Sequence, residues 1–319
     1  MHHQKAPVLD VVAGVIQDAT GRVLISKRHQ HQHQGGLWEF PGGKREPGES
    51  KRRALARELY EEIGIRVISS EPMLRVFYRY QDRQVRLHFR QVTGYQGKVR
   101  SREKQQIDWR LPINLPIDEF PAADRPLVNR LQLPDRMLIA GPVADGLPAF
   151  LLGLGQALAS GIKLVQLRAP QLDRETYGRL AQMVAKLCRQ HRAYLMLNPP
   201  AGMAYPSLGD GLHLNSARLM QTKVRPEEGR SVRIGASCHD LVELRHAERM
   251  GLDYALLSPV KPTASHPDAI PMGWKRFAEL ARQVSLPVYA LGGMGAMDVR
   301  RAICCGGQGI AAMRGLWPG

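Results

Sequence analysis

Hydrophobic and polar positions in the first third of the chain predict short strands around one helix. Apolar runs rich in β-branched or aromatic residues predict strands at 8–16, 23–26, 73–80 and 85–92. Between the second and third of these, Leu55, Leu59 and Ile63 recur every four residues, as on the buried face of a helix. Ser50 can serve as its N-cap and Gly64 as its stop, so a helix is predicted over 50–63.

Turns and loops connect these elements. Residues 19–22, Ala-Thr-Gly-Arg, predict a tight turn that joins the first two strands as a hairpin. A loop rich in glutamine and histidine covers 28–34, and a proline-bearing loop at 111–121 precedes a last short helix at about 122–131. The first domain is therefore predicted to be an α+β fold with a mixed sheet and flanking helices.

The pattern changes after residue 134, where apolar strand-like segments begin to alternate with amphipathic helices. The eight segments are 137–140, 164–167, 194–197, 211–214, 232–236, 254–257, 288–291 and 309–312. Eight strands with intervening helices predict a closed parallel (β/α)8 barrel. The chain stops at Gly319, which leaves little room for the eighth helix. We therefore expect domains at 1–133 and 136–319.

Length and composition agree with two globular domains. The 319 residues exceed what one small core usually organises, and 44% hydrophobic with 23% charged residues excludes a disordered or fibrous chain. No apolar run approaches the roughly 18 residues that span a bilayer, and residues 1–7 lack the apolar stretch of a secretory signal. The four cysteines form no CxxC pair and indicate reduced thiols. We expect a cytoplasmic protein without a membrane partner.

The formal net charge is +16, and the excess is spread over both halves: residues 1–135 hold 23 basic and 16 acidic side chains. Such a charge suits an anionic ligand such as a nucleotide. An arginine-rich solvated surface explains it equally well. Nucleic acid rests on charge alone, and stable binding to it is the reading that the sequence favours least.

Three carboxylates crowd one face of the predicted helix. Glu58 and Glu62 are i,i+4 neighbours with Glu61 beside them, a spacing at which like charges destabilise a helix. They also lie near the C-terminal end, where the helix dipole disfavours anions. Arginines at 52, 53 and 57 could balance them on a solvated face. The alternative is a divalent cation such as Mg²⁺, which takes carboxylate oxygens and bridges to substrate phosphates.

The same segment resembles the Nudix box: Gly43, five residues, Glu49, seven residues, then Arg57 through Ile65. So many fixed positions in 23 residues rarely arise by chance. The resemblance implies hydrolysis of a nucleoside diphosphate linked to another group, with Mg²⁺ or Mn²⁺ as the cofactor.

The resemblance also implies roles for individual residues. Glu58, Glu61 and Glu62 match the positions of metal ligands and base, and Arg57 matches the arginine that orients a catalytic glutamate. Gly43 would offer its carbonyl to the metal. Glu103 falls where related enzymes carry one more acidic residue and is expected to be an auxiliary ligand or base; the alternative is an exposed loop glutamate.

Residues 8–131 resemble the MutT-type 8-oxo-dGTP diphosphatases most closely, through the runs at 37–44 and 120–126. The resemblance implies that Arg28 and His33 hold the nucleotide, that Phe40 lies in its pocket, and that the last helix reads the base. Asp124 departs from that pattern, because relatives carry asparagine there and an ionised aspartate only accepts hydrogen bonds. Its other interpretation is a first-turn acid favoured by the helix dipole.

His29, His31 and His33 alternate with glutamines and invite a zinc interpretation. No fourth ligand is apparent, so a polar loop at the edge of the substrate site is the favoured interpretation.

The second half resembles thiamine-phosphate synthase over most of 136–314. The matching runs lie at 165–168, 211–214, 234–239, 251–254, 258–263 and 290–294, at or near predicted strand ends. Barrel active sites assemble there. Gly292 and Gly293 could cradle a phosphate with backbone N–H groups, or could serve only a tight turn.

Four departures affect the expected metal and phosphate ligands of that barrel. Pro199 follows Asn198 where the synthase pattern has aspartate, and Ala217 replaces an acidic residue. Residues 168–170 read Arg-Ala-Pro instead of Arg-Glu-Lys, and 265–266 read Ser-His instead of Thr-Lys. We expect a barrel that has lost synthase chemistry and binds a phosphate-bearing ligand or provides a surface for homo-oligomers.

The leading hypothesis is therefore a Mg²⁺-dependent hydrolase that converts 8-oxo-dGTP to 8-oxo-dGMP and pyrophosphate and so keeps oxidised nucleotides out of DNA. Three alternatives remain. The protein could be a bifunctional enzyme whose barrel still makes thiamine phosphate, its hydrolase could act on another nucleotide, or its barrel could regulate or stabilise the hydrolase.

Overall fold

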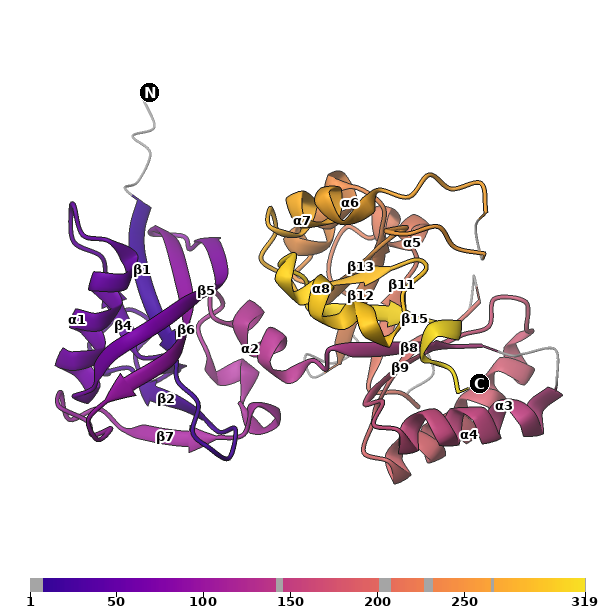
Figure 1. Ribbon diagram of the computed structural model, residues 1–319, viewed down its shortest axis with the longest axis horizontal. Helices are drawn as coiled ribbons and strands as arrows, with labels where there is room; N and C mark the ends of the chain where they lie inside the picture. The colour runs from indigo at the N-terminus through magenta and orange to yellow at the C-terminus, as the bar shows by residue number, and fades with distance from the viewer. Residues whose placement is uncertain (1–7, 142–145, 201–207, 227–231, 265–266, 319) are drawn as a thin grey trace. The chain divides into compact units, whose positions relative to one another are not determined.

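A computed structural model describes residues 8–141, 146–200, 208–226, 232–264 and 267–318 (Figure 1). The chain forms two compact units, one ending at Gln132 and the other beginning at Leu133. Each unit has its own hydrophobic clusters, so each is described by itself. No helix among the described residues has the length and apolar character needed to cross a bilayer.

The first unit contains two small sheets. One has the order β4 (Gly42–Lys44), β1 (Val8–Val15), β6 (Gln84–Gln96), β5 (Arg66–Arg79), with β1 and β6 parallel. The other has the order β3 (Trp38–Glu39), β2 (Val23–Lys27), β7 (Ile107–Arg110). The helices are α1 (Lys51–Ile63) and α2 (Arg125–Gln132), with short 3-10 turns η1 (Pro112–Asn114) and η2 (Ile117–Glu119). The predicted mixed sheet with flanking helices is confirmed.

The predicted hairpin of the first two strands is wrong beyond its turn. The turn forms, because Asp18 Oδ1 accepts hydrogen bonds from the backbone N–H groups of Thr20 and Arg22. A single bridge joins Gln17 and Val23, after which β1 and β2 enter different sheets. β2 is apolar on both faces and buries them in two different clusters, so it needs cover on both sides.

Helix α1 begins and ends at the predicted caps. Ser50 Oγ accepts a hydrogen bond from the N–H of Arg53 at 3.3 Å, and Gly64 adopts the left-handed conformation at φ +74°. Leu55, Leu59 and Ile63 are completely buried. Full burial of such a side chain contributes about 1.5–3 kcal/mol, so this face fixes the rotation of the helix. The carboxylates on its adjoining face are held in place as a consequence.

The second unit is a closed barrel of eight parallel strands, as predicted. Their order is β10-β11-β12-β13-β14-β15-β8-β9. The strands are β8 (Arg136–Ala140), β9 (Leu164–Arg168), β10 (Tyr194–Asn198), β11 (Gly211–Leu214), β12 (Arg233–Cys238), β13 (Tyr254–Leu257), β14 (Val288–Leu291) and β15 (Gly309–Ala312). The helices are α3 (Gly146–Ala159), α4 (Arg174–Gln190), α5 (Ser216–Gln221), α6 (Leu241–Arg249), α7 (Gly273–Ala281) and α8 (Val299–Cys304), with the 3-10 turn η3 (Ala296–Asp298) before α8.

Only the 3-10 turn η4 (Arg314–Leu316) follows β15 among the described residues, where a regular barrel would have its eighth helix. Trp317 packs there instead. Its ring stacks on Phe150 of α3, with centroids 5.5 Å apart, and lies so close to Gly153 that a β-carbon there would meet it at 2.8 Å. This packing covers apolar surface of α3 that would otherwise be exposed.

Candidate active site and barrel cavity

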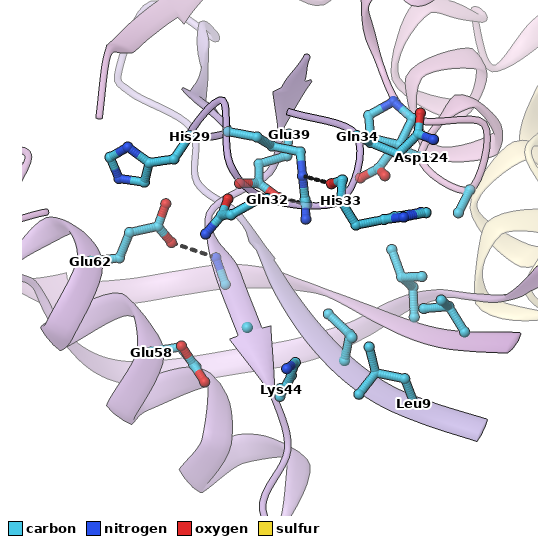
Figure 2. A pocket seen from close by; sticks show the side chains of 18 of the residues that line it. Leu9, His29, Gln32, His33, Gln34, Glu39, Lys44, Glu58, Glu62 and Asp124 are labelled. Atoms are coloured by element: carbon cyan, nitrogen blue, oxygen red, sulfur yellow. Dashed lines mark hydrogen bonds and ion pairs between the residues drawn. The ribbon is translucent and has the colours of Figure 1, made fainter. Parts of the chain in front are cut away.

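A cavity of about 540 Å³ opens in the first unit. Strands β1 and β6 contribute Leu9, Val11, Val85 and Leu87, and the β4 segment contributes Gly42 to Lys44. Figure 2 shows the carboxylates of Glu58 and Glu62 on one side of the cavity and Asp124 on the other. The cavity therefore has an acidic end at α1 and a second polar end near α2.

Glu58 is the half-buried carboxylate at the mouth of the acidic end. Its Oε1 accepts a hydrogen bond from Arg57 at 2.8 Å. Its Oε2 lies against the backbone of Gly43, since a β-carbon there would be 2.2 Å from that oxygen. Glycine at position 43 therefore makes room for the carboxylate.

Glu62 is buried more deeply and fully engaged. Its Oε1 accepts hydrogen bonds from Ser26 Oγ at 2.9 Å and Gln105 Nε2 at 3.1 Å, and its Oε2 accepts from the N–H of Gly42 at 2.8 Å. Three donors from three segments hold this carboxylate in one orientation. Burial nevertheless raises the pKa of Glu62, and the charge of Glu103 adds to the rise.

Arg57 joins three carboxylates. Its Nε and NH2 groups donate to the two oxygens of Glu49, at 3.3 and 3.1 Å, and its NH1 donates to Glu58 and to Glu61. The hydrogen bonds to Glu49 are the main reason that the pKa of Arg57 lies above its ordinary value. Arg57 therefore acts as a fixed cation that positions Glu58.

Glu61 and Glu103 lie in different surroundings. Glu61 is half-exposed, pairs with Arg57 at 3.2 Å, and is not among the residues that line the cavity. Glu103 lines the cavity, close enough to Glu58 and Glu62 for its charge to raise both pKa values. Glu103 is exposed and lies in a loop, as the exposed-loop interpretation expects, and it also lines the cavity.

The carboxylate oxygens at this end of the cavity are the kind of ligand that a hard divalent cation takes. Burial raises the pKa of Glu58, and the charges of Glu61 and Glu103 raise it further, so negative charges are in excess here. Across the described chain, no three His, Cys, Asp or Glu side chains stand close enough together to hold a metal ion unaided. A cation here would draw on Glu58, Glu62 and Glu103, with substrate oxygens and water completing its shell.

The other end of the cavity contains the buried acid Asp124, the partly buried acid Glu39 and one arginine. Arg28 NH1 contacts the carboxylate of Glu39, and Arg28 Nε donates to the carbonyl of His33 at 2.9 Å. Burial raises the pKa of Glu39 to about 8 and that of Asp124 to about 7. The charge of the Arg28 guanidinium opposes both rises but does not cancel them.

The last helix begins at Arg125, one residue after Asp124, which is 6% exposed. Asp124 thus lies at the N-terminal end of α2, where its carbonyl accepts a hydrogen bond from the N–H of Val128, and this position agrees with an acid favoured by the helix dipole. Its side chain also lines the cavity and has lost most of its hydration. Tyr80 lies in the same wall; burial raises its pKa to about 12, and its hydroxyl accepts a hydrogen bond from the N–H of Ala123.

His33 lies at the cavity, whereas Phe40 lies in the hydrophobic core. His33 lines the cavity, and its ring meets that of Tyr80 edge-on at 5.0 Å. Phe40 does not line it: only 2% exposed, it packs against Phe89 and Phe120 in the core. The expectation that Phe40 lies in the nucleotide pocket is corrected, because alternation along this extended segment turns Glu39 toward the cavity and Phe40 inward.

The remaining histidines of that loop stack on each other: the rings of His29 and His31 lie 5.5 Å apart and nearly parallel. His33 points elsewhere, toward Tyr80 and Asp82. Loop 28–34 thus forms one edge of the cavity through His29, Gln32, His33 and Gln34.

A second cavity, of about 760 Å³, lies at the carboxyl ends of the barrel strands. Its lining contains Arg168, His239 and Arg314 but no aspartate or glutamate among the described residues. The buried oxygen of Gln166 has no hydrogen-bond partner there. Such a lining suits an anion and lacks the carboxylates that hold a metal.

Two of the departures from the synthase pattern, Pro199 and Ala217, lie at or next to this cavity. Arg218 donates hydrogen bonds to the carbonyls of Pro199 and Pro200, so a guanidinium lies beside the segment where the pattern has a metal-binding aspartate. Ala217 lines the cavity without a polar side chain. Ala169 is buried, while Ser265 and His266 lie outside the described residues.

Gly292 and Gly293 line the same cavity, both with positive φ, at +96° and +64°. A β-carbon at Gly293 would be 2.3 Å from the carbonyl oxygen of Pro262, and one at Gly292 would be 2.9 Å from Pro259. The tight turn by itself therefore requires glycine here, whether or not a phosphate binds.

The structure adds four residues that sequence reasoning missed. Ser26 and Gln105 hold Glu62, Glu49 holds Arg57, and Glu39 shares the far end of the cavity with Asp124. Only Glu49 had a signal, as a fixed position of the motif. Ser26 and Gln105 reach the site through long-range contacts that no local pattern reveals, and Glu39 lies within the run 37–44 without a role of its own being predicted for it.

Comparisons with known proteins divide the chain at the same place. A family model described as the NUDIX domain matches residues 12–130, and one described as thiamine monophosphate synthase matches residues 137–316. In the first region the chain is 32% identical over 124 residues to an 8-oxo-dGTP diphosphatase and 36% identical over 122 residues to a CTP pyrophosphohydrolase, both of Escherichia coli K12. These matches cover 39% and 38% of this chain and 96% and 90% of the relatives.

In the second region the chain is 31% identical over 180 residues to a thiamine-phosphate synthase of Desulfitobacterium hafniense Y51. The match covers 56% of this chain and 87% of that protein.

Proposed function

The chain belongs to the Nudix family through residues 12–130 and to the thiamine monophosphate synthase family through residues 137–316, and on this basis we propose that it is a divalent-metal-dependent nucleoside triphosphate pyrophosphohydrolase. Its preferred substrate in this proposal is 8-oxo-dGTP, which is hydrolysed to 8-oxo-dGMP and pyrophosphate. The observation that carries the proposal is the set of carboxylates Glu58, Glu62 and Glu103 at one end of a cavity of nucleotide size.

The chain's own residues supply orientation and proton transfer. Arg57 fixes Glu58, and three donors fix Glu62, so both carboxylates are held before substrate enters. Glu58 Oε2 or Glu103 is the group that accepts the proton of the attacking water. Mg²⁺ or Mn²⁺, held by Glu58, Glu62, Glu103, the Gly43 carbonyl and the more exposed Glu61, would neutralise phosphate oxygens and acidify that water.

The far end of the cavity is proposed to hold the nucleoside. Arg28 and His33 lie where they can contact the nucleotide, and Asp124 faces the base. With its pKa near 7, Asp124 is partly protonated at neutral pH, and a neutral carboxyl group donates and accepts as an amide does. In that form it can donate to O6 and accept from N7–H of an 8-oxoguanine. A partly protonated Asp124 therefore supports 8-oxo-dGTP as the substrate despite the departure from asparagine.

A second candidate substrate is CTP, because the similarity to a CTP pyrophosphohydrolase is as extensive. An ionised Asp124 could accept from the exocyclic amino group of cytosine. The two candidates therefore differ in which protonation state of Asp124 binds the base.

The barrel is proposed to be a non-catalytic binding domain for a phosphate-bearing ligand, and also the surface through which the chain forms homo-oligomers. Its cavity is lined by Arg168 and Arg314 and by none of the carboxylates that a metal-pyrophosphate substrate needs. A reduced cytoplasmic setting belongs to the same proposal, because all four cysteines are free thiols.

A nucleotide screen tests the proposed function. The full chain with Mg²⁺ would be given 8-oxo-dGTP, dGTP, CTP and dCTP, with kcat/KM measured for each and products separated by chromatography. We expect 8-oxo-dGMP with pyrophosphate and the highest kcat/KM for 8-oxo-dGTP. Equal rates for dGTP, or release of orthophosphate instead of pyrophosphate, would refute the substrate or the reaction.

A further inference from the structure

One face of the β4-β1-β6-β5 sheet carries a cluster of positive side chains that the hydrolase site does not use. Along β6, Val85, Leu87 and Phe89 belong to the apolar cluster on one face of the sheet. The alternate residues Arg86, His88 and Arg90 therefore lie on the opposite face. The register of β5 places Arg75 beside His88 and Phe77 beside Arg86 on that same face.

Helix α1 covers only part of this face. A β-carbon at Gly14 of β1 would meet Leu59 of the helix at 2.9 Å, so α1 lies over the end of β1 that contains Gly14. Toward the start of β1 the face is occupied by charged side chains instead. The first turn of α1 adds Lys51 and Arg52, both exposed, to the border of this charged area.

The carboxylate of Asp10 is shared among several of these positive side chains. Asp10 accepts a hydrogen bond from Arg45 at 2.8 Å and lies 3.3 Å from His88 and 3.6 Å from Arg86, so one carboxylate serves three cationic or titratable groups. Arg90, only 7% exposed, donates to the hydroxyl and carbonyl oxygens of Ser70. In the described chain no carboxylate lies within ion-pair distance of Arg90.

An aromatic ring stands among these cations. Phe77 is 52% exposed, although the same strand buries Val76 next to it. Arg75 and Arg79 flank it at two-residue spacing, which puts neighbouring side chains about 7 Å apart on one face. β5 is the edge of its sheet, so the row is accessible from the side as well. An exposed ring between cations is the arrangement on which bases of single-stranded nucleic acids stack while their phosphates are neutralised.

We propose that this basic sheet face, made of Lys51, Arg52, Arg75, Phe77, Arg79 and Arg86, binds single-stranded nucleic acid. The phosphates lie against the arginines and a base stacks on Phe77. A single strand is favoured over a duplex because only an unpaired base can offer its face to the ring. The proposal rests on the placement of these charges on the part of the sheet face that α1 leaves open, and not on the overall charge of the chain.

The basic sheet face goes beyond the proposed function, because it is separate from the nucleotide cavity. Leu9, Val11, Val85 and Leu87 line that cavity from the other face of β1 and β6. A strand on the basic sheet face therefore leaves the hydrolase cavity open, and the two sites can be tested independently.

Fluorescence anisotropy with labelled 15-residue oligo-dT and oligo-rU tests the proposal on the full chain, and the two oligomers show whether the sugar matters. We expect saturable binding, with the slope of log Kd against log salt reduced by about 1.4 in the double variant R75E/R79E, as for the loss of two phosphate contacts to a single strand. Binding by that variant should weaken at least tenfold. F77A should weaken binding about fivefold or more with an unchanged salt slope.

The matched control is R179E/R276E, which makes the same charge change at exposed arginines of α4 and α7 and should bind like the wild type. Hydrolysis of nucleotide by F77A and R75E/R79E should remain at the wild-type rate, which also shows that they fold. Equal losses in both double variants, displacement by free nucleotide, or equal binding of duplex DNA or polyglutamate would each overturn the proposal.

Discussion

The carboxylate of Glu58 rests against Gly43, so closely that a β-carbon at position 43 would lie 2.2 Å from Glu58 Oε2. Gly42, its neighbour, faces backbone instead: a β-carbon there would lie 2.2 Å from the carbonyl oxygen of Val12, and its φ is +152°. The two adjacent glycines are therefore required for different reasons: Gly43 leaves room for a site carboxylate, whereas Gly42 leaves room for the backbone of β1 while its N–H holds Glu62.

This difference predicts the outcome of two alanine variants. G43A should displace the flexible end of Glu58 and lower kcat/KM by about 100-fold while thermal stability changes little. G42A should lower the free energy of unfolding by more than about 1 kcal/mol, because backbone cannot move aside. Thermal melts and kinetics of both variants check this. Similar activity losses with equal destabilisation in both would contradict the distinction.

The second prediction concerns Ser26, which is completely buried and donates to Glu62 Oε1. In S26A the ionised form of Glu62 loses a hydrogen bond worth about 1.5–3 kcal/mol, so its pKa should rise further. The acidic limb of the kcat/KM profile should therefore move to higher pH. The control S101A removes a donor to Gln105 one step further from the carboxylate and should move it less. An unshifted limb in S26A would show that Glu62 does not act as a carboxylate.

Asp124 predicts a pH dependence of stability. Burial raises its pKa from 3.8 to about 7, so the neutral form is the one that folding favours. Its contribution is fully present below about pH 4 and is lost as pH rises to about 7, at up to about 1.4 kcal/mol per pH unit. D124N cannot ionise at this position. The melting temperature of the wild type relative to D124N should therefore fall between pH 4 and 7; a constant difference would argue against a buried, protonated Asp124.

For the barrel we expect no synthase activity but retained binding of a phosphate-bearing ligand. Pro199 and Ala217 offer no carboxylate, and Arg218 lies beside the first of them. Supplied with the pyrimidine pyrophosphate, thiazole phosphate and Mg²⁺, the full chain should form no thiamine phosphate. Thiazole phosphate alone should still raise the melting temperature of the barrel through Arg168 and Arg314. Turnover would establish a bifunctional enzyme, and the absence of any shift would remove the binding role.

Local patterns were sufficient for much of this fold. The caps Ser50 and Gly64 and the eight barrel strands follow from period and turn chemistry within a few residues of each element. The hairpin of β1 and β2 failed because strand pairing is decided by distant partners, here β6 and β7. The apolar residues on both faces of β2 already indicated a strand that is buried on both sides, which a simple hairpin with β1 does not provide.

The site residues also fall into two groups, those that a local motif predicts and those that only the fold brings to the site. Gly43, Arg57, Glu58 and Glu62 belong to one continuous motif, and the structure brings them together at α1. Ser26, Gln105 and Glu39 arrive from separate strands and loops, so their contribution appears only in three dimensions. Burial is likewise a tertiary property: the inward Phe40 and the desolvated Asp124 could not be read from neighbouring residues.

The central claim is that Glu58 and its neighbouring carboxylates hold a divalent cation against a nucleoside triphosphate. Its most direct test is the rate of 8-oxo-dGTP hydrolysis by wild type and E58Q as a function of Mg²⁺ concentration, since glutamine keeps the shape and removes the charge. We predict that E58Q loses at least about 100-fold in kcat, that EDTA abolishes wild-type turnover, and that both proteins melt alike. Near-normal turnover by E58Q, or wild-type turnover that survives EDTA, would contradict the claim.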